Sequence, residues 1–131
     1  YNYKLMFEDR TISVMSYNLE TLMAEKLQTI LVRDIANTRM RDFYDIHFLS
    51  KEKEEELKTG NLLHKAFLAT CEKRETVYQN EDIHKIYERI FHDDVIRERW
   101  ELFRKDNYFV GKVEWDDVIR QVGKVFEWLD K

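Results

Sequence analysis

The chain has 131 residues, 44% of them hydrophobic, a composition that suits one folded domain and excludes a disordered chain. The formal net charge of −4 argues against nucleic-acid binding through overall electrostatics, so any such contact needs a local basic patch. The single cysteine, Cys71, excludes an internal disulfide and a cysteine-rich zinc site, and we expect it to be a small core residue.

Apolar runs are short throughout the sequence. None approaches the ~20 residues of a membrane-spanning helix, and the first residues lack the basic and apolar pattern of a signal peptide. We therefore expect a cytoplasmic protein that makes no membrane contact. The chain contains no proline and three glycines, which favours long helices.

The first predicted element is β structure in residues 3–16, where apolar and polar side chains alternate in two short runs. Two strands alone are barely stable in water, so a larger sheet or a helix must support them. The chain also does not begin with Met. We expect it to be the C-terminal part of a longer protein, and a processed start is the other explanation.

The remainder is predicted to be helical, giving a mainly α fold with a small β remnant at the N-terminus. Apolar residues at helical spacing predict helices over residues 19–33, 40–50, 61–74, 82–91, 93–105 and 114–130. Asn18 or Ser16 is expected to cap the first of these. The charged run 51–58 is interpreted as a solvated helix end or exposed loop, and 108–110 as a short extended piece. Core packing is the expected role of Trp100, Trp115 and Trp128.

Lys26 occupies an unusual position in the first helix, because it falls inside the apolar stripe that includes Leu22 and Ile30. An ordinary surface lysine would lie on the opposite face. Three explanations remain open: the side chain extends to water along its own stem, pairs with a buried acid, or contacts a negatively charged ligand.

The second helix also carries charges on its apolar face. Asp42 and Asp45 are three residues apart and share that face, and the helix dipole explains Asp42 better than Asp45. Arg39 and Arg41 flank the start of the helix, where they form an anion site or pair with Asp42, Asp45 or Glu20. The pattern fits phosphate or nucleotide handling without naming a reaction.

Two segments of this region resemble motifs of the AbiEii/AbiGii toxins. Residues 17–27, with Ala24-Glu25-Lys26-Leu27, resemble the family's Leu and Ala-Glu-Lys-Leu helix. Residues 37–45, with Arg39-Met40-Arg41-Asp42 and Asp45, resemble its Arg-x-Lys-Asp-x-x-Asp segment. Either motif alone is weak, but the two occur in the family's order and at its short spacing. The resemblance covers about residues 5–50.

The resemblance implies the C-terminal part of a polymerase-β-like nucleotidyltransferase, an α+β protein. Such toxins of bacterial toxin–antitoxin and abortive-infection systems transfer a nucleotide from an NTP, and in some members the acceptor is tRNA. Catalysis in such folds uses Mg²⁺ held by carboxylates. The implied cofactors are thus Mg²⁺ and NTP in the intact protein, and the implied partners are a cognate antitoxin and tRNA.

The resemblance also implies roles for individual residues. Lys26 would contact the NTP phosphates, and Asp42 would act as a base or electrostatic partner. Supporting and phosphate-positioning roles would fall to Asp45, Glu20, Arg39 and Arg41. Arg41 stands where the family usually has Lys, which keeps the charge but changes the hydrogen-bond geometry.

The family's earlier motif, Gly-Ser followed by a metal-binding Asp-x-Asp, does not precede Lys26 in this sequence. We therefore expect no metal ligands in this chain and no nucleotide transfer by the chain alone. Residues 1–50 would end the nucleotidyltransferase-like domain, and residues 51–131 would form a helical region packed on it. The alternative function is a non-enzymatic helical module that binds an antitoxin-like partner, which the acidic balance and the Lys/Glu-rich helices would suit.

Overall fold

The computed structural model describes residues 18–59 and 61–130, and their regular structure is entirely helical. The elements are α2 (Leu19–Arg33), the 3-10 turn η1 (Asp34–Ala36), α3 (Met40–Glu52), α4 (Glu54–Lys58), α5 (Leu62–Lys73), α6 (Asn80–Phe91), α7 (Asp94–Asp106), η2 (Tyr108–Val110), α8 (Trp115–Glu127) and η3 (Trp128–Asp130). The mainly α prediction is confirmed, whereas the predicted β remnant in 3–16 lies outside the described residues.

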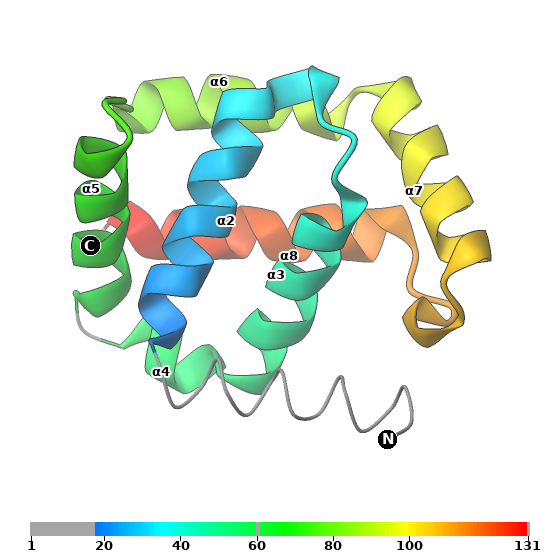
Figure 1. Cartoon of the computed structure of the whole chain (residues 1–131), viewed down its shortest axis with the longest axis horizontal. Coiled ribbons are helices and arrows are strands. Elements are labelled where there is room, and N and C mark those ends of the chain that lie inside the picture. Colours follow the sequence, from blue (N-terminus) through cyan, green and yellow to red (C-terminus); the bar gives the residue numbers. More distant parts are fainter. Residues whose placement is uncertain (1–17, 60, 131) are drawn as a thin grey trace.

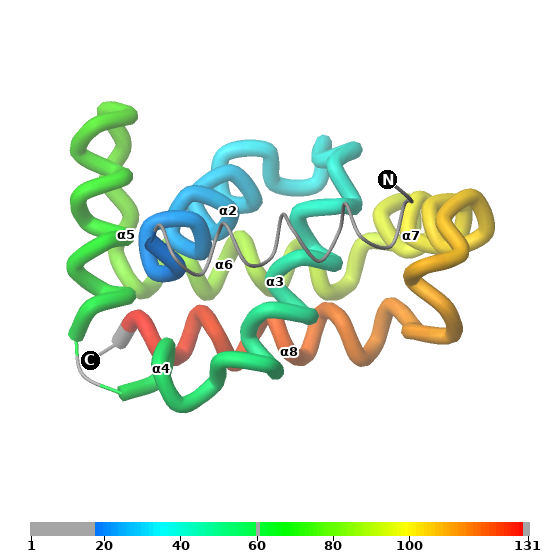
Figure 2. The backbone as a smooth tube through the Cα atoms, turned by 60° about the horizontal axis from the view of Figure 1, so that its bottom comes forward, coloured from blue at the N-terminus to red at the C-terminus, as the bar shows by residue number. Residues whose placement is uncertain are grey.

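The helices form two crossed sets. α6 and α8 run alongside each other, α2 and α3 lie across them, and α5 and α7 stand at opposite ends (Figure 1). A second view shows α3 crossing α8 and α2 lying next to α5 (Figure 2). The core lies where these layers meet. There the Phe43 ring of α3 meets Trp115 edge-on at 5.1 Å, and Trp100 of α7 lies 6.0 Å from Trp115.

Local signals set some of the helix starts. Asn18 caps α2, as one of the two predicted caps, because its Oδ1 accepts a hydrogen bond from the Thr21 backbone N–H at 3.0 Å. α6 begins two residues earlier than predicted because Gln79 and Asp82 form a capping box.

Burial of Trp100, Trp115, Trp128 and Cys71 confirms their predicted packing role.

Two connecting segments differ from the sequence prediction. The charged run contains a short helix, α4, because Leu57 is buried in the core while most of the charged residues around it stay at least partly exposed. The extended piece predicted at 108–110 is wrong: these residues form the 3-10 turn η2, whose i→i+3 bonds include Gly111 N–H to Tyr108 O at 3.1 Å. Among the described residues, no helix is both long and apolar enough to cross a bilayer.

Gly123 permits a close approach between α8 and α6. A Cβ at this position would lie 2.6 Å from the Tyr87 hydroxyl oxygen, which donates a hydrogen bond to the Ile119 carbonyl at 2.8 Å. The Tyr87 side chain is half-buried beside Phe126, and this setting raises its pKa to about 12, chiefly through desolvation. Moving the ring away from α8 would therefore cost the hydrogen bond to Ile119 and the contact with Phe126.

We predict that Gly123→Ala lowers the free energy of unfolding by about 1 kcal/mol, the low end of overpacking costs. A helix-interior Gly→Ala change normally stabilises by about 1 kcal/mol, so the sign is diagnostic. Urea denaturation measures the size and the sign of this change in the free energy of unfolding. In a Tyr87→Leu background the same substitution should become stabilising, and a stabilising effect already in the wild-type background would contradict the packing argument.

His47 of α3 makes stability depend on pH. It is buried, and its Nε2 atom has no hydrogen-bond partner among the described residues. Burial lowers its pKa below the ordinary value of 6.5, Lys51 lowers it further, and Asp117 opposes the shift. Below pH ~6.5 the His47 imidazole therefore binds a proton more readily in the unfolded chain than in the folded chain.

We predict that His47 contributes a loss of stability as the pH falls from about 7.5 to 5.5, because this interval spans the ordinary histidine pKa. His47→Gln should make the fall in melting temperature over this interval smaller. His84→Gln, which changes an exposed histidine, should leave it unchanged. Equal pH profiles for wild type and His47→Gln would show that His47 titrates alike in both states.

Candidate functional site

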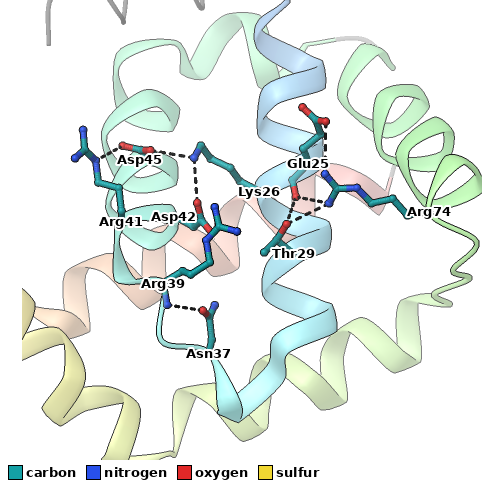
Figure 3. A network of polar contacts seen from close by, with 9 residues as sticks. All are labelled: Glu25, Lys26, Thr29, Asn37, Arg39, Arg41, Asp42, Asp45 and Arg74. Carbon is teal, nitrogen blue, oxygen red and sulfur yellow. Dashed lines mark hydrogen bonds and ion pairs between the residues drawn. The ribbon is translucent and has the colours of Figure 1, made fainter. Parts of the chain in front are cut away.

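The crossing of α2 and α3 places the Lys26 ammonium group between two carboxylates (Figure 3). Lys26 Nζ donates a hydrogen bond to Asp42 Oδ1 at 3.1 Å and lies 3.0 Å from Asp45 Oδ2. The side chains of Lys26, Asp42 and Asp45 are 11%, 5% and 8% exposed. Of the explanations that the sequence left open for Lys26, pairing with a buried acid is the one observed in this conformation.

Each aspartate also faces an arginine from the start of α3. Arg39 Nε lies 3.2 Å from Asp42 Oδ2, and Arg41 Nε donates to Asp45 Oδ1 at 3.2 Å. The first contact is close but poorly oriented, so Asp42 Oδ2 stays a buried acceptor without a hydrogen bond among the described residues. Both acids therefore lie between two cations, and these five side chains carry a formal net charge of about +1 at neutral pH.

The two arginines are less buried than the residues they face. The Arg39 side chain is 54% exposed and that of Arg41 34%, and the Arg41 guanidinium also lies 4.8 Å from the centre of the Phe109 ring. Surface ion pairs of this kind contribute little to stability, whereas the buried pairs of Lys26 cannot lose one partner cheaply. The cluster thus has a rigid buried centre and two cations that reach the surface.

The turn between α2 and α3 sets the spacing of this cluster. Asp34 has a φ of 52°, and Arg89 of α6 donates to its carboxylate at 2.6 Å. Buried Asn37 accepts a hydrogen bond from the Arg39 backbone N–H at 2.7 Å through its Oδ1. Arg99 of α7 donates to the carbonyls of residues 35 and 37, both at 3.1 Å. Later helices therefore hold the turn that delivers Arg39 and Asp42.

The structure brings together five of the six residues that the sequence proposed for the site, and it adds the residues that position them. Glu20 takes part in none of the ion pairs of this cluster. The residues that hold the turn, Asn37, Arg89 and Arg99, carry no local signal beyond the turn itself. Arg89 and Arg99 each reach partners more than fifty positions away in the sequence.

The described residues do not fit a Mg²⁺ site. Within residues 18–59 and 61–130 there is no group of three or more His, Cys, Asp or Glu side chains that could hold a metal ion. Asp42 and Asp45, the two acids of the cluster, already face Lys26, Arg39 and Arg41. A divalent cation prefers carboxylate oxygens that are not held by ammonium or guanidinium groups.

Comparison with known proteins agrees with the two motifs that form the cluster. Residues 1–121 match the family model described as nucleotidyl transferase AbiEii toxin, type IV toxin–antitoxin system. Searches of curated proteins and of solved structures gave no match. The family match spans both the α2–α3 region and most of the helices packed on it, and the chain therefore belongs to the AbiEii nucleotidyltransferase toxin family.

Proposed function

We propose that this chain supplies the nucleotide-handling part of a toxin that transfers a nucleotide from an NTP to an acceptor, with tRNA as the acceptor. The observation that carries the proposal is the buried ammonium group of Lys26 between Asp42 and Asp45 at 3.1 and 3.0 Å. Burying three ionised groups in a small helical protein costs free energy, which hydrophobic residues would avoid. A requirement for a positioned charge explains why the arrangement is present.

The chemistry assigned to Lys26 is contact with the NTP phosphates. An ammonium group has three N–H donors, and two of them face Asp42 and Asp45. The two carboxylates fix the nitrogen in place, so that the remaining donor meets an incoming phosphate oxygen without reorganisation. Asp42 is the electrostatic partner in this step, and Asp45 supports it.

The two arginines extend the same charge toward solvent. Arg39 and Arg41 are assigned to position phosphate, because both side chains reach the surface beside the buried carboxylates and a guanidinium group matches phosphate oxygens in charge and geometry. Glu20 lies on the flank of α2, and its assignment rests on the family motif alone. Metal ions assist phosphoryl transfer in nucleotidyltransferases generally.

Family membership also implies a cognate antitoxin. The second candidate function is therefore a helical module that binds this partner without chemistry of its own. Several large apolar side chains are exposed among the described residues, including Leu62, Leu68, Val77 and Leu102, and they are available to a protein partner. The two functions differ in what they predict for loss of Lys26. The first predicts that nucleotide transfer is lost, and the second predicts that antitoxin binding, the whole function of the module, is kept.

We predict that Lys26→Met, in the protein as encoded by its gene, lowers the rate of nucleotide transfer from labelled NTP by about a hundredfold or more. It should also lower the free energy of unfolding, by up to ~3 kcal/mol, because Asp42 and Asp45 lose their shared partner. Transfer to tRNA, cell toxicity and urea denaturation are measured together.

A second variant separates lost chemistry from lost folding. Lys26→Met/Asp42→Asn/Asp45→Asn removes all three buried charges at nearly constant volume, so it should unfold close to wild type while staying inactive. Lys85→Met, which removes an exposed lysine paired with Glu81, is the matched control and should keep full activity. Transfer at the wild-type rate by the triple variant would overturn the roles proposed for Lys26, Asp42 and Asp45. Absence of transfer by the unmodified protein, with antitoxin binding kept by both the unmodified protein and the triple variant, would instead favour the non-enzymatic module.

A further inference from the structure

An open hollow lies on the outer face of α2, beside the Lys26 cluster. Its volume is about 430 Å³, and its lining comes from α2, from the start of α3 and from the segment that follows α5. The lining residues are Gln28, Thr29, Val32, Arg33, Arg39, Arg74 and Thr76. Three of the seven are arginines and none is acidic, in a chain whose net charge is −4.

The floor of the hollow is a connected polar network. Arg74 Nη1 donates to Thr29 Oγ1 at 3.2 Å (Figure 3). The same nitrogen also donates to Gln28 Oε1 at 2.6 Å. Gln28 Nε2 in turn donates to Thr76 Oγ1 at 3.2 Å. Arg74 Nη2 lies 3.5 Å from the Glu25 carboxylate, a half-exposed group outside the lining. The Arg74 guanidinium is therefore held in one orientation before any ligand arrives.

The other two arginines have donors to spare. Arg33 is exposed and makes no hydrogen bond or ion pair with any described residue. Arg39 faces only the buried Asp42 Oδ2, at 3.2 Å and in poor orientation. An arginine carries five N–H donors in a planar fork that matches phosphate oxygens. The hollow thus presents cationic donors that the protein itself leaves unused.

Helical geometry links this hollow to Lys26. Lys26, Thr29 and Arg33 follow one another at i, i+3 and i+7 on α2, so they lie along the same side of the helix. Arg39 belongs both to the lining of the hollow and to the ion pairs of Asp42. One ligand could therefore contact the hollow and the exposed edge of the Lys26 cluster together.

We propose that this hollow is a phosphate-binding subsite, in which Arg33, Arg39 and Arg74 hold phosphate groups of the ligand that reaches Lys26. Its place in a reaction rests on the proposed function, but phosphate binding is measured without turnover. Two sources share this chemistry: the triphosphate of an NTP and the sugar-phosphate backbone of an acceptor RNA. The open shape admits either one, and the test separates them.

The test measures binding of two probes to the protein as encoded: inorganic tripolyphosphate by calorimetry, and a fluorescent single-stranded RNA by anisotropy. We expect Arg33→Gln to weaken at least one probe about tenfold, as for a lost hydrogen bond to a charged group. If RNA is the ligand, the slope of log affinity against log salt should also fall by about 1. Arg33 has no described partner, so the substitution leaves the fold intact.

Arg120→Gln is the matched control, because Arg120 is also exposed, lacks an ion pair among the described residues and lies outside the hollow. A loss confined to tripolyphosphate assigns the subsite to the NTP, and a loss confined to RNA assigns it to the acceptor. Binding of neither probe, or equal losses with Arg33→Gln and Arg120→Gln, would overturn the proposal. If Lys26→Met keeps full transfer while Arg33→Gln still weakens a probe, the proposed function fails and the subsite stands.

Discussion

The arrangement of the α2–α3 region depends on one constraint: a lysine that is 11% exposed must keep two carboxylates within hydrogen-bonding distance. Charges taken out of water are tolerated only when they are paired with good geometry. Asp42 and Asp45 meet this need because they are three residues apart and face α2 together. The helix crossing, the intervening turn and the two flanking arginines all follow from holding these atoms together.

Sequence alone could predict much of this region. Lys26 stands inside an apolar stripe, and Asp42 and Asp45 interrupt another apolar stripe. The pattern therefore identifies charged residues that need partners. The mainly α fold and the positions of the longer helices follow from the same periodicity. The short helix α4 was missed because burial of Leu57 overrides a run of charges. The turn η2 was missed because three consecutive apolar residues look alike in an extended piece and a 3-10 turn.

The remainder depended on contacts between distant parts of the chain. Arg89 and Arg99 look like ordinary surface arginines of amphipathic helices, yet they hold residues 34–37. The basic hollow joins α2 with residues 74 and 76, a pairing that no local spacing reveals. Its charge also runs against the acidic total, so the overall composition hides it.

The hydrogen bonds from Arg99 to the α2–α3 turn have an evolutionary consequence. Because its two hydrogen bonds end on backbone carbonyls, the turn can change its own side chains freely while α7 must keep a long donor at this position. Loss of that donor would weaken the turn that positions Arg39 and Asp42, although neither residue would itself be changed. On the proposed function, substitutions on α7 would therefore attenuate the toxin although they lie far from the charged cluster, and attenuated alleles should be sought on both.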